Sequence, residues 1–225
     1  MKAVQIKHYS KTVETILSEI PIPTINEREV LIKVVEAAVN PLDLLILTGS
    51  VKLIQNYSMP LILGNECSGV IVKIGNKVTK FKEGDKVYTR LPLKKIGPFA
   101  EYVSVDADAV ALIPEGYDLK IASAIPLTGL TAYQGITEIL KAKSGETILI
   151  TGGSGSFGQM AVPIAKALGL KVIVSGNEKA QAYITKIGAD QYLDYRKTNY
   201  WGTYRISIMS LIPWVPKNLI TNYQF

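Results

Sequence analysis

The chain has 225 residues, of which 48% are apolar and 20% are charged. This composition can bury a hydrophobic core, so it excludes an intrinsically disordered or fibrous protein. The formal net charge is +6, but no basic stripe with interleaved aromatic residues accompanies it, so we do not expect nucleic-acid binding. The single cysteine, Cys67, excludes an internal disulfide and a multi-cysteine zinc site.

The amino-terminal sequence MKAVQIKHYS lacks the apolar stretch of a signal peptide. No segment approaches the roughly 20 apolar residues of a membrane-spanning helix. We therefore expect a soluble cytoplasmic protein without a membrane partner.

The first 120 residues predict β structure. Segments rich in β-branched or aromatic residues alternate with clusters of Pro, Gly, Asn and Asp, a pattern typical of a barrel-like all-β domain. The expected strands are Ala3 to Ile6, Thr15 to Ile20, Val30 to Val39, Leu61 to Ile74, Lys86 to Leu91, Phe99 to Val105 and Val110 to Ile113.

After Pro114 the pattern changes to alternating α and β elements. A helix is expected from Ile121 to Leu140, broken near Pro126. Apolar strands and amphipathic helices then alternate, which predicts a parallel sheet covered by helices over residues 121–199. The expected elements are strands Glu146 to Ile150, Lys171 to Val174 and Gln191 to Leu193, and helices Ser156 to Leu168 and Glu178 to Ile187.

A glycine-rich turn lies between the first of these strands and the helix that follows it. It reads Gly153-Ser154-Gly155-Ser156-Phe157-Gly158, a G-x-G-x-x-G. In this context one glycine makes the tight turn, one lets a pyrophosphate approach the backbone, and one lets helix and strand pack closely. The motif predicts dinucleotide binding at the amino terminus of the helix, and an ordinary structural turn is the alternative.

The end of the second strand bears on which dinucleotide is bound. An NAD site places a carboxylate there for the ribose 2′-hydroxyl, which would repel a 2′-phosphate. Ser175 occupies the strand end instead, and Lys179 follows four residues later. This favours NADPH over NADH, with a solvated surface lysine as the alternative reading of Lys179.

Several motifs together resemble the medium-chain dehydrogenase/reductase superfamily, and within it the zinc-free quinone oxidoreductase-like branch. The resemblance covers residues 1 to about 197 and implies a GroES-like β-barrel domain followed by an incomplete Rossmann-type parallel sheet. Besides the glycine turn, the motifs are NPLDLLILTG (40–49), LGNECSGVIVKIG (63–75), FKEGDKVY (81–88), GPFAEYVSV (97–105) and IPLTGLTAYQGI (125–136).

The positions that carry zinc ligands in zinc-dependent members hold Asn40, Asn65 and Leu127 here. Leucine cannot bind a metal, and neutral asparagine is a poor substitute for cysteine or histidine. The resemblance therefore implies a metal-free protein, and it disfavours a zinc alcohol dehydrogenase.

In the resembled branch, residues at the positions of Asn40 and Thr131 approach the nicotinamide, and the residue at the position of Tyr195 lies near the adenosine phosphate. Asp43 is a candidate polar group at the cleft, with helix capping as the alternative. Each of the other three residues also has a structural alternative. Asn40 could be a turn residue, Thr131 a hydroxyl on a helix face, and Tyr195 an aromatic residue at a strand end. His8 lies in none of the motifs and is expected at the surface.

These features imply hydride transfer from NADPH to a small-molecule acceptor, a quinone or an activated alkene. Two other hypotheses remain open: a non-catalytic NADPH-binding protein and an inactive fragment. Members of the resembled family are usually homo-oligomers, but the segment that makes their dimer contacts is expected to be missing from this chain.

The family pattern stops after the third strand of the nucleotide domain, which would leave the first strand as an open apolar edge. The tail from Tyr200 to Phe225 holds both tryptophans, no acidic residue and two prolines, Pro213 and Pro216. One base out of frame, its possible codons permit Val-Ile-Asp-Thr-Leu-Gly, which resembles the fourth-strand motif of the superfamily. We therefore expect residues 200–225 to be an aberrant tail, from a frameshift that ends the reductase early.

Overall fold

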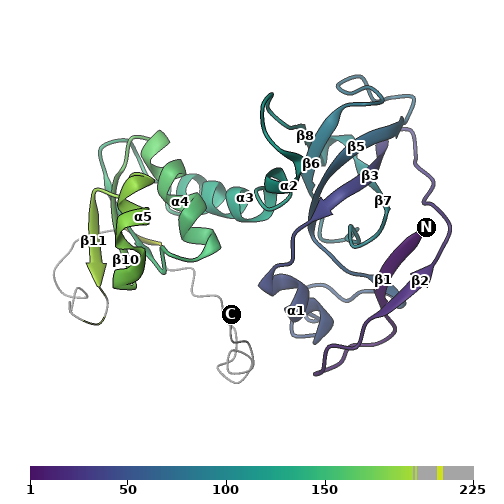
Figure 1. Cartoon of the computed structure of the whole chain (residues 1–225), viewed down its shortest axis with the longest axis horizontal. Helices are drawn as coiled ribbons and strands as arrows, with labels where there is room; N and C mark the ends of the chain where they lie inside the picture. The colour runs from purple at the N-terminus through teal and green to yellow at the C-terminus, as the bar shows by residue number, and fades with distance from the viewer. Residues whose placement is uncertain (195, 197–206, 210–225) are drawn as a thin grey trace. The chain divides into compact units, whose positions relative to one another are not determined.

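The computed structural model describes residues 1–194, 196 and 207–209. The chain divides into two compact units, Met1–Leu127 and Thr128–Phe225. The first is mostly β structure and the second is α/β (Figure 1).

The larger sheet of the first unit is antiparallel, with strand order β7-β3-β5-β6-β8. Alternate side chains of its strands face inward, as expected for a half-buried sheet. They form one core with Val30, Ile32, Cys67, Ile71 and Val87 at its centre. The strands are β3 (Glu29–Ala37), β5 (Glu66–Ile74), β6 (Lys86–Arg90), β7 (Tyr102–Asp106) and β8 (Val110–Leu112), with a 3-10 turn at Ala107–Ala109.

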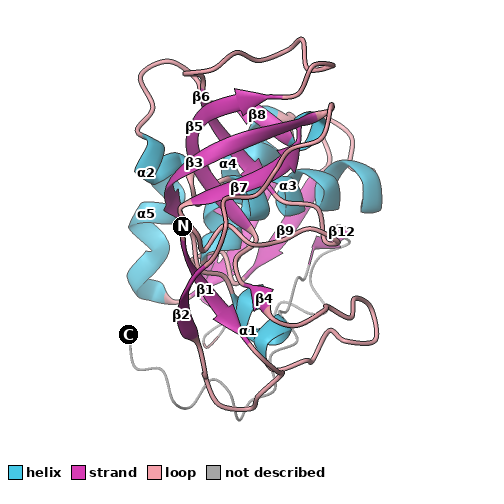
Figure 2. Cartoon of the chain, turned by 90° about the vertical axis from the view of Figure 1, so that its right-hand side faces the viewer, coloured by secondary structure: helices cyan, strands magenta, loops and turns pink. Residues whose placement is uncertain are grey.

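A smaller antiparallel sheet has the order β2-β1-β4. Its strands are β1 (Lys2–Ile6), β2 (Ile16–Glu19) and β4 (Leu61–Ile62). Helix α1 (Pro41–Leu47) packs beside it, because Ile46 and Leu47 share a buried cluster with Ile6 (Figure 2).

Two expectations for the first unit were wrong. The apolar run from Leu61 to Ile74 is two strands, because the chain turns between them at Gly64, whose φ of +101° is in the left-handed region. The helix Pro41–Leu47 is missing from the expected elements, although helix capping was one of the two readings of Asp43.

The second unit holds a parallel sheet of order β11-β10-β9-β12. Its strands are β9 (Thr147–Thr151), β10 (Lys171–Gly176), β11 (Gln191–Asp194) and β12 (Ser207–Met209). Numbered by their order in this unit, they read 3-2-1-4, the first part of the Rossmann strand order. Helix α4 (Ser156–Ala167) covers one face, where Ala161, Val162 and Ala165 join Ile148 and Val172 in the core.

The expected helices of this region are confirmed, including the break before Pro126. The stretch before the sheet consists of α2 (Leu119–Ala122), α3 (Pro126–Gln134) and a π-helical turn, Gly135–Ile139. The helix after β10 is a 3-10 turn, Glu178–Ala180, followed by α5 (Gln181–Lys186).

The sequence suggested that the edge of β9 would be open. In the structure this edge is paired with another strand. Strand β12 pairs with it in parallel, placing Ser207, Ile208 and Met209 opposite Ile148, Leu149 and Ile150. The remainder of the tail, and with it the predicted frameshift, lies outside the described residues.

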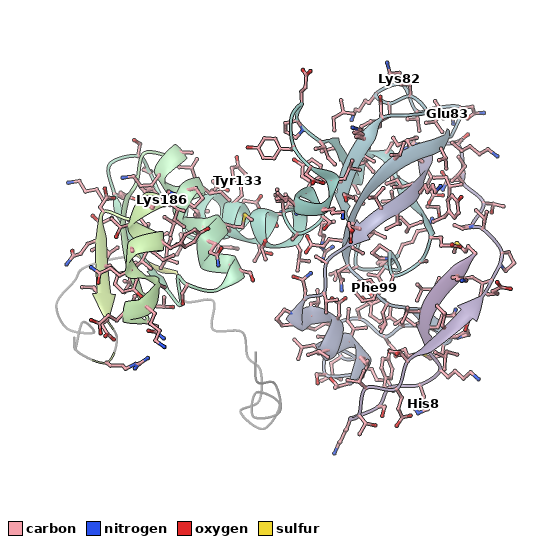
Figure 3. All side chains as sticks on the ribbon, in the orientation of Figure 1. His8, Lys82, Glu83, Phe99, Tyr133 and Lys186 are labelled. Atoms are coloured by element: carbon pink, nitrogen blue, oxygen red, sulfur yellow. The ribbon has the colours of Figure 1, made fainter. Side chains whose placement is uncertain are left out.

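His8 lies at the surface of the first unit, as predicted (Figure 3). None of the helices in the described part of the chain combines the length and apolarity that crossing a membrane requires.

Candidate functional site

The turn between β9 and α4 is closed by two buried glycines. A Cβ on Gly153 would lie 2.1 Å from Cγ1 of Val174 on β10, and one on Gly158 would lie 2.2 Å from Cα of Gly153. Backbone and branched side chains cannot yield by that much, so both positions require glycine. Strand and helix are thereby brought into direct contact.

The middle glycine of the motif, Gly155, is exposed, and steric packing does not explain why this position is glycine. Gly155 is the N-cap of α4 with φ −78°, a value open to any residue. A Cβ there would meet only the Gly152 carbonyl oxygen, at an ordinary 3.4 Å. Packing within the protein therefore does not demand glycine here, whereas close approach of a ligand to the backbone would.

The side chains next to Gly155 also leave its backbone accessible to a ligand. Ser154 and Ser156 are exposed, and Phe157 packs against the core of the unit. The first N–H groups of an α-helix have no acceptor within the helix and carry partial positive charge. This turn therefore fits a pyrophosphate.

The end of β10 lies directly behind this turn. Ser175 is 2% exposed, and its carbonyl oxygen accepts a hydrogen bond of 3.2 Å from the Gly153 amide. Its side chain is therefore inside the fold, and the residue supports the turn. Lys179 is exposed. Tyr195 lies outside the described residues.

Asn40 lies in the first unit, at the N-cap of α1, and is 8% exposed. Its amide N–H donates to Oδ2 of Asp43 at 2.7 Å, so Asp43 caps the helix as one of its two readings proposed. Its side-chain Nδ2 donates to Oε1 of Glu66, also at 2.7 Å. Asn40 is thus held from both sides by carboxylates.

The same two carboxylates hold the other positions that match zinc ligands. Asn65 Nδ2 donates to Oδ1 of Asp43 at 2.7 Å, and the Leu127 amide donates to Oε2 of Glu66 at 2.7 Å. A buried network of Asn40, Asp43, Asn65, Glu66 and the Leu127 amide therefore occupies this part of the fold. The described part of the chain contains no cluster of His, Cys, Asp and Glu that could hold a metal ion.

Glu66 is the member of this network that sequence reasoning missed. Its signal was present, since an acidic residue stands at the start of a β-branched strand, and in the structure it is 0% exposed. Such a residue needs partners, because an unpaired buried carboxylate is costly.

Burial raises the pKa values of Asp43 and Glu66, although each accepts hydrogen bonds that act in the opposite direction. Arg90, opposite Glu66 in the β5–β6 register, acts to lower the Glu66 pKa. The neighbouring Cys67 is 0% exposed, and burial raises the pKa of its thiol to about 12. Cys67 is therefore not a nucleophile at neutral pH.

Thr131 lies on α3 in the second unit and is exposed. Asn40 lies in the first unit, so the two residues predicted near the nicotinamide belong to different units.

Residues 26–115 match the alcohol dehydrogenase GroES-like domain family. This stretch contains most of the first unit, and the parallel sheet with its glycine turn follows it in the second. The chain belongs to the medium-chain dehydrogenase/reductase superfamily.

Curated members of the superfamily show how far the likeness extends. The chain is 35% identical over 209 residues to a 2-methylene-furan-3-one reductase from Solanum lycopersicum, covering 89% of this chain and 53% of that protein. It is 33% identical to a quinone oxidoreductase from Homo sapiens, covering 89% of this chain and 60% of that protein. The chain thus spans little more than half the length of these relatives.

Among solved structures, the chain resembles the Escherichia coli quinone oxidoreductase complexed with NADPH. The TM-score is 0.74 at 27% identity, covering 88% of this chain and 60% of that one. The similarity extends through both units of the fold.

Proposed function

We propose that this chain is an NADPH-dependent oxidoreductase that transfers hydride to a quinone or an activated alkene without a metal ion. The single observation that carries the proposal is Gly155, exposed at the N-cap of α4, where a Cβ would meet only ordinary contact. Glycine at this position favours a ligand that lies against the backbone, and the helix terminus favours an anionic one.

The protein's own residues supply binding and orientation. The first-turn amides of α4 would hold the pyrophosphate of NADPH, and Lys179 would attract its 2′-phosphate. When bound, NADPH supplies the hydride, which is the difficult chemistry of the reaction. By the family resemblance, Asn40 and Thr131 would each contact the nicotinamide, and Asp43 and Glu66 would act through Asn40 as positioning residues.

The donor set at the zinc-ligand positions supports the absence of a metal from the reaction. The side-chain amide groups of Asn40 and Asn65 donate to carboxylates, and Leu127 offers only an aliphatic side chain. A conjugated acceptor suits this arrangement, because it takes hydride without a strong Lewis acid to polarise it.

The names of the relatives support the same acceptor classes: a furanone reductase, a quinone oxidoreductase and an NADPH-dependent alkenal/one oxidoreductase from Arabidopsis thaliana. We infer a small-molecule acceptor for this chain as well.

The test is consumption of NADPH by the purified chain, with a naphthoquinone and an α,β-unsaturated ketone as separate acceptors. We expect oxidation of NADPH that depends on the acceptor and persists after dialysis against a metal chelator. Binding of NADPH without turnover would contradict the enzyme and favour a non-catalytic nucleotide-binding protein. Absence of both would contradict the proposal altogether.

A further inference from the structure

Tyr192 on β11 reaches across to the loop that follows β10. It lies opposite Val174 in the parallel register, and its hydroxyl donates to the carbonyl oxygen of Asn177. This hydroxyl also occupies the space beside Gly176, where a Cβ would lie 2.6 Å from Oη. A side chain at position 176 would therefore displace the Tyr192 hydroxyl, although the φ of Gly176 is not in the left-handed region.

The loop that Tyr192 contacts is held at further points. The Asn177 carbonyl also accepts a hydrogen bond of 2.9 Å from the Ala180 amide, and Asn177 Oδ1 accepts one of 3.1 Å from the Lys179 amide. The 3-10 turn Glu178–Ala180 thus has its backbone fixed, and Lys179 projects from it as an exposed side chain. Two of these three contacts are local to the turn, and the bond from Tyr192 comes from the neighbouring strand β11.

We propose that Tyr192 is a positioning residue that sets the preference for a 2′-phosphorylated nucleotide, by fixing the turn that carries Lys179. The inference rests on the proposed function, because it assumes that a dinucleotide lies on the α4 turn. The 2′ position of the adenosine ribose is read by residues just after the second strand. Lysine is a point charge on a flexible stem, so the position of its backbone decides where the charge is concentrated.

Calorimetric titration of the full chain with 2′,5′-ADP and with 5′-ADP tests this directly. Tyr192→Phe keeps the ring and removes the hydroxyl. We expect its dissociation constant for 2′,5′-ADP to rise by about fivefold, because the turn that carries Lys179 is held less firmly, while that for 5′-ADP is unchanged. The free energy of one ordinary hydrogen bond is the upper limit of this effect. Tyr183→Phe is the matched control, because it removes a hydroxyl that bonds Gln159 at 3.2 Å in the same unit.

The outcomes distinguish failure of the proposed role of Tyr192 from failure of the proposed NADPH-dependent function. If the unmodified chain binds neither nucleotide, the proposed function fails. If it binds 2′,5′-ADP and Tyr192→Phe binds it equally well, or loses both nucleotides in equal proportion, only the role of Tyr192 is overturned.

A second pair of variants tests the contact with Gly176 through thermal stability. Gly176→Ala should lower the melting temperature of the chain, because the new Cβ overlaps Oη of Tyr192. In the Tyr192→Phe background the same change should cost clearly less, since the nearest remaining ring atom, Cζ, is 3.3 Å away. Equal costs in the two backgrounds would overturn the proposed contact.

Discussion

The side-chain amide of Asn40 donates to Oε1 of Glu66 at 2.7 Å, and this bond ties the start of α1 to the start of β5. The other oxygen of Glu66 accepts from the Leu127 amide, so one carboxylate joins three segments that are distant in the sequence. The Glu66 carboxylate thus links α1, β5 and the Leu127 backbone within the first unit.

Glu66→Gln tests that link. Glutamine offers one acceptor where Glu66 offers two, so one of the two bound N–H groups loses its partner. We expect a loss of about 1–3 kcal/mol in the free energy of unfolding. Urea denaturation measures it, with Glu101→Gln as control, because Glu101 is exposed and its carboxylate accepts a hydrogen bond from the Lys2 backbone amide.

The same variant has a defined pH dependence. Burial raises the folded-state pKa of Glu66, so its contribution to stability is full below the unfolded pKa, about 4.3, and is lost as pH rises through the folded value. The difference between the unmodified chain and Glu66→Gln should therefore shrink from pH 4 to pH 8. A difference that grows over this range would show that the folded state favours the charged form.

The glycines of the phosphate turn should respond differently to alanine. In Gly158→Ala the new Cβ meets the Gly153 backbone at 2.2 Å, which should cost about 1–3 kcal/mol and abolish nucleotide binding. Gly155→Ala should leave the melting temperature nearly unchanged and still weaken NADPH binding at least tenfold. If Gly155→Ala binds NADPH as well as the unmodified chain does, the turn is structural only.

Cys67 should resist alkylation in the native protein. Its side chain is fully buried and its pKa is about 12, so little thiolate exists at pH 8 and no reagent reaches it. Mass spectrometry after treatment with iodoacetamide should show no adduct in buffer and one adduct in urea. Rapid labelling in buffer would indicate that the β-rich unit opens readily.

Asp190→Asn should destabilise the second unit by less than about 1 kcal/mol at neutral pH, because the pair with Lys166 is partly exposed. The hydrogen bond from Lys166, at 2.8 Å, lowers the pKa of Asp190. Its contribution is therefore present above the usual pKa of about 3.9 and is lost as pH falls further. Thermal melts at pH 7 and pH 3 measure this, with the exposed Glu83→Gln as control, and a gap that widens in acid would contradict it.

Local spacing was enough to predict the glycine turn and the strands β9, β10 and β11 around it. The three glycines of the motif have fixed positions relative to one another, and the apolar strands need no partner to be recognised. The role of Gly158 in packing follows from the same spacing, whereas the contact of Gly153 with Val174 is seen only in the structure.

Other features depend on contacts that no local pattern reveals. Pro41–Leu47 is apolar almost throughout, so its helical form shows only in the cap that Asp43 provides. The role of Glu66 depends on partners 26 and 61 residues away. Strand β12 is three residues long, too short for a period of two to be recognised.

The central claim is that this chain binds NADPH through the turn at α4. Its most direct test is calorimetric titration of the unmodified chain with NADPH and, separately, with NADH. We predict saturable binding of NADPH that is tighter than that of NADH, and binding of NADPH that is at least tenfold weaker in Gly155→Ala. Absence of binding by a folded chain, or tighter binding of NADH, would contradict the claim.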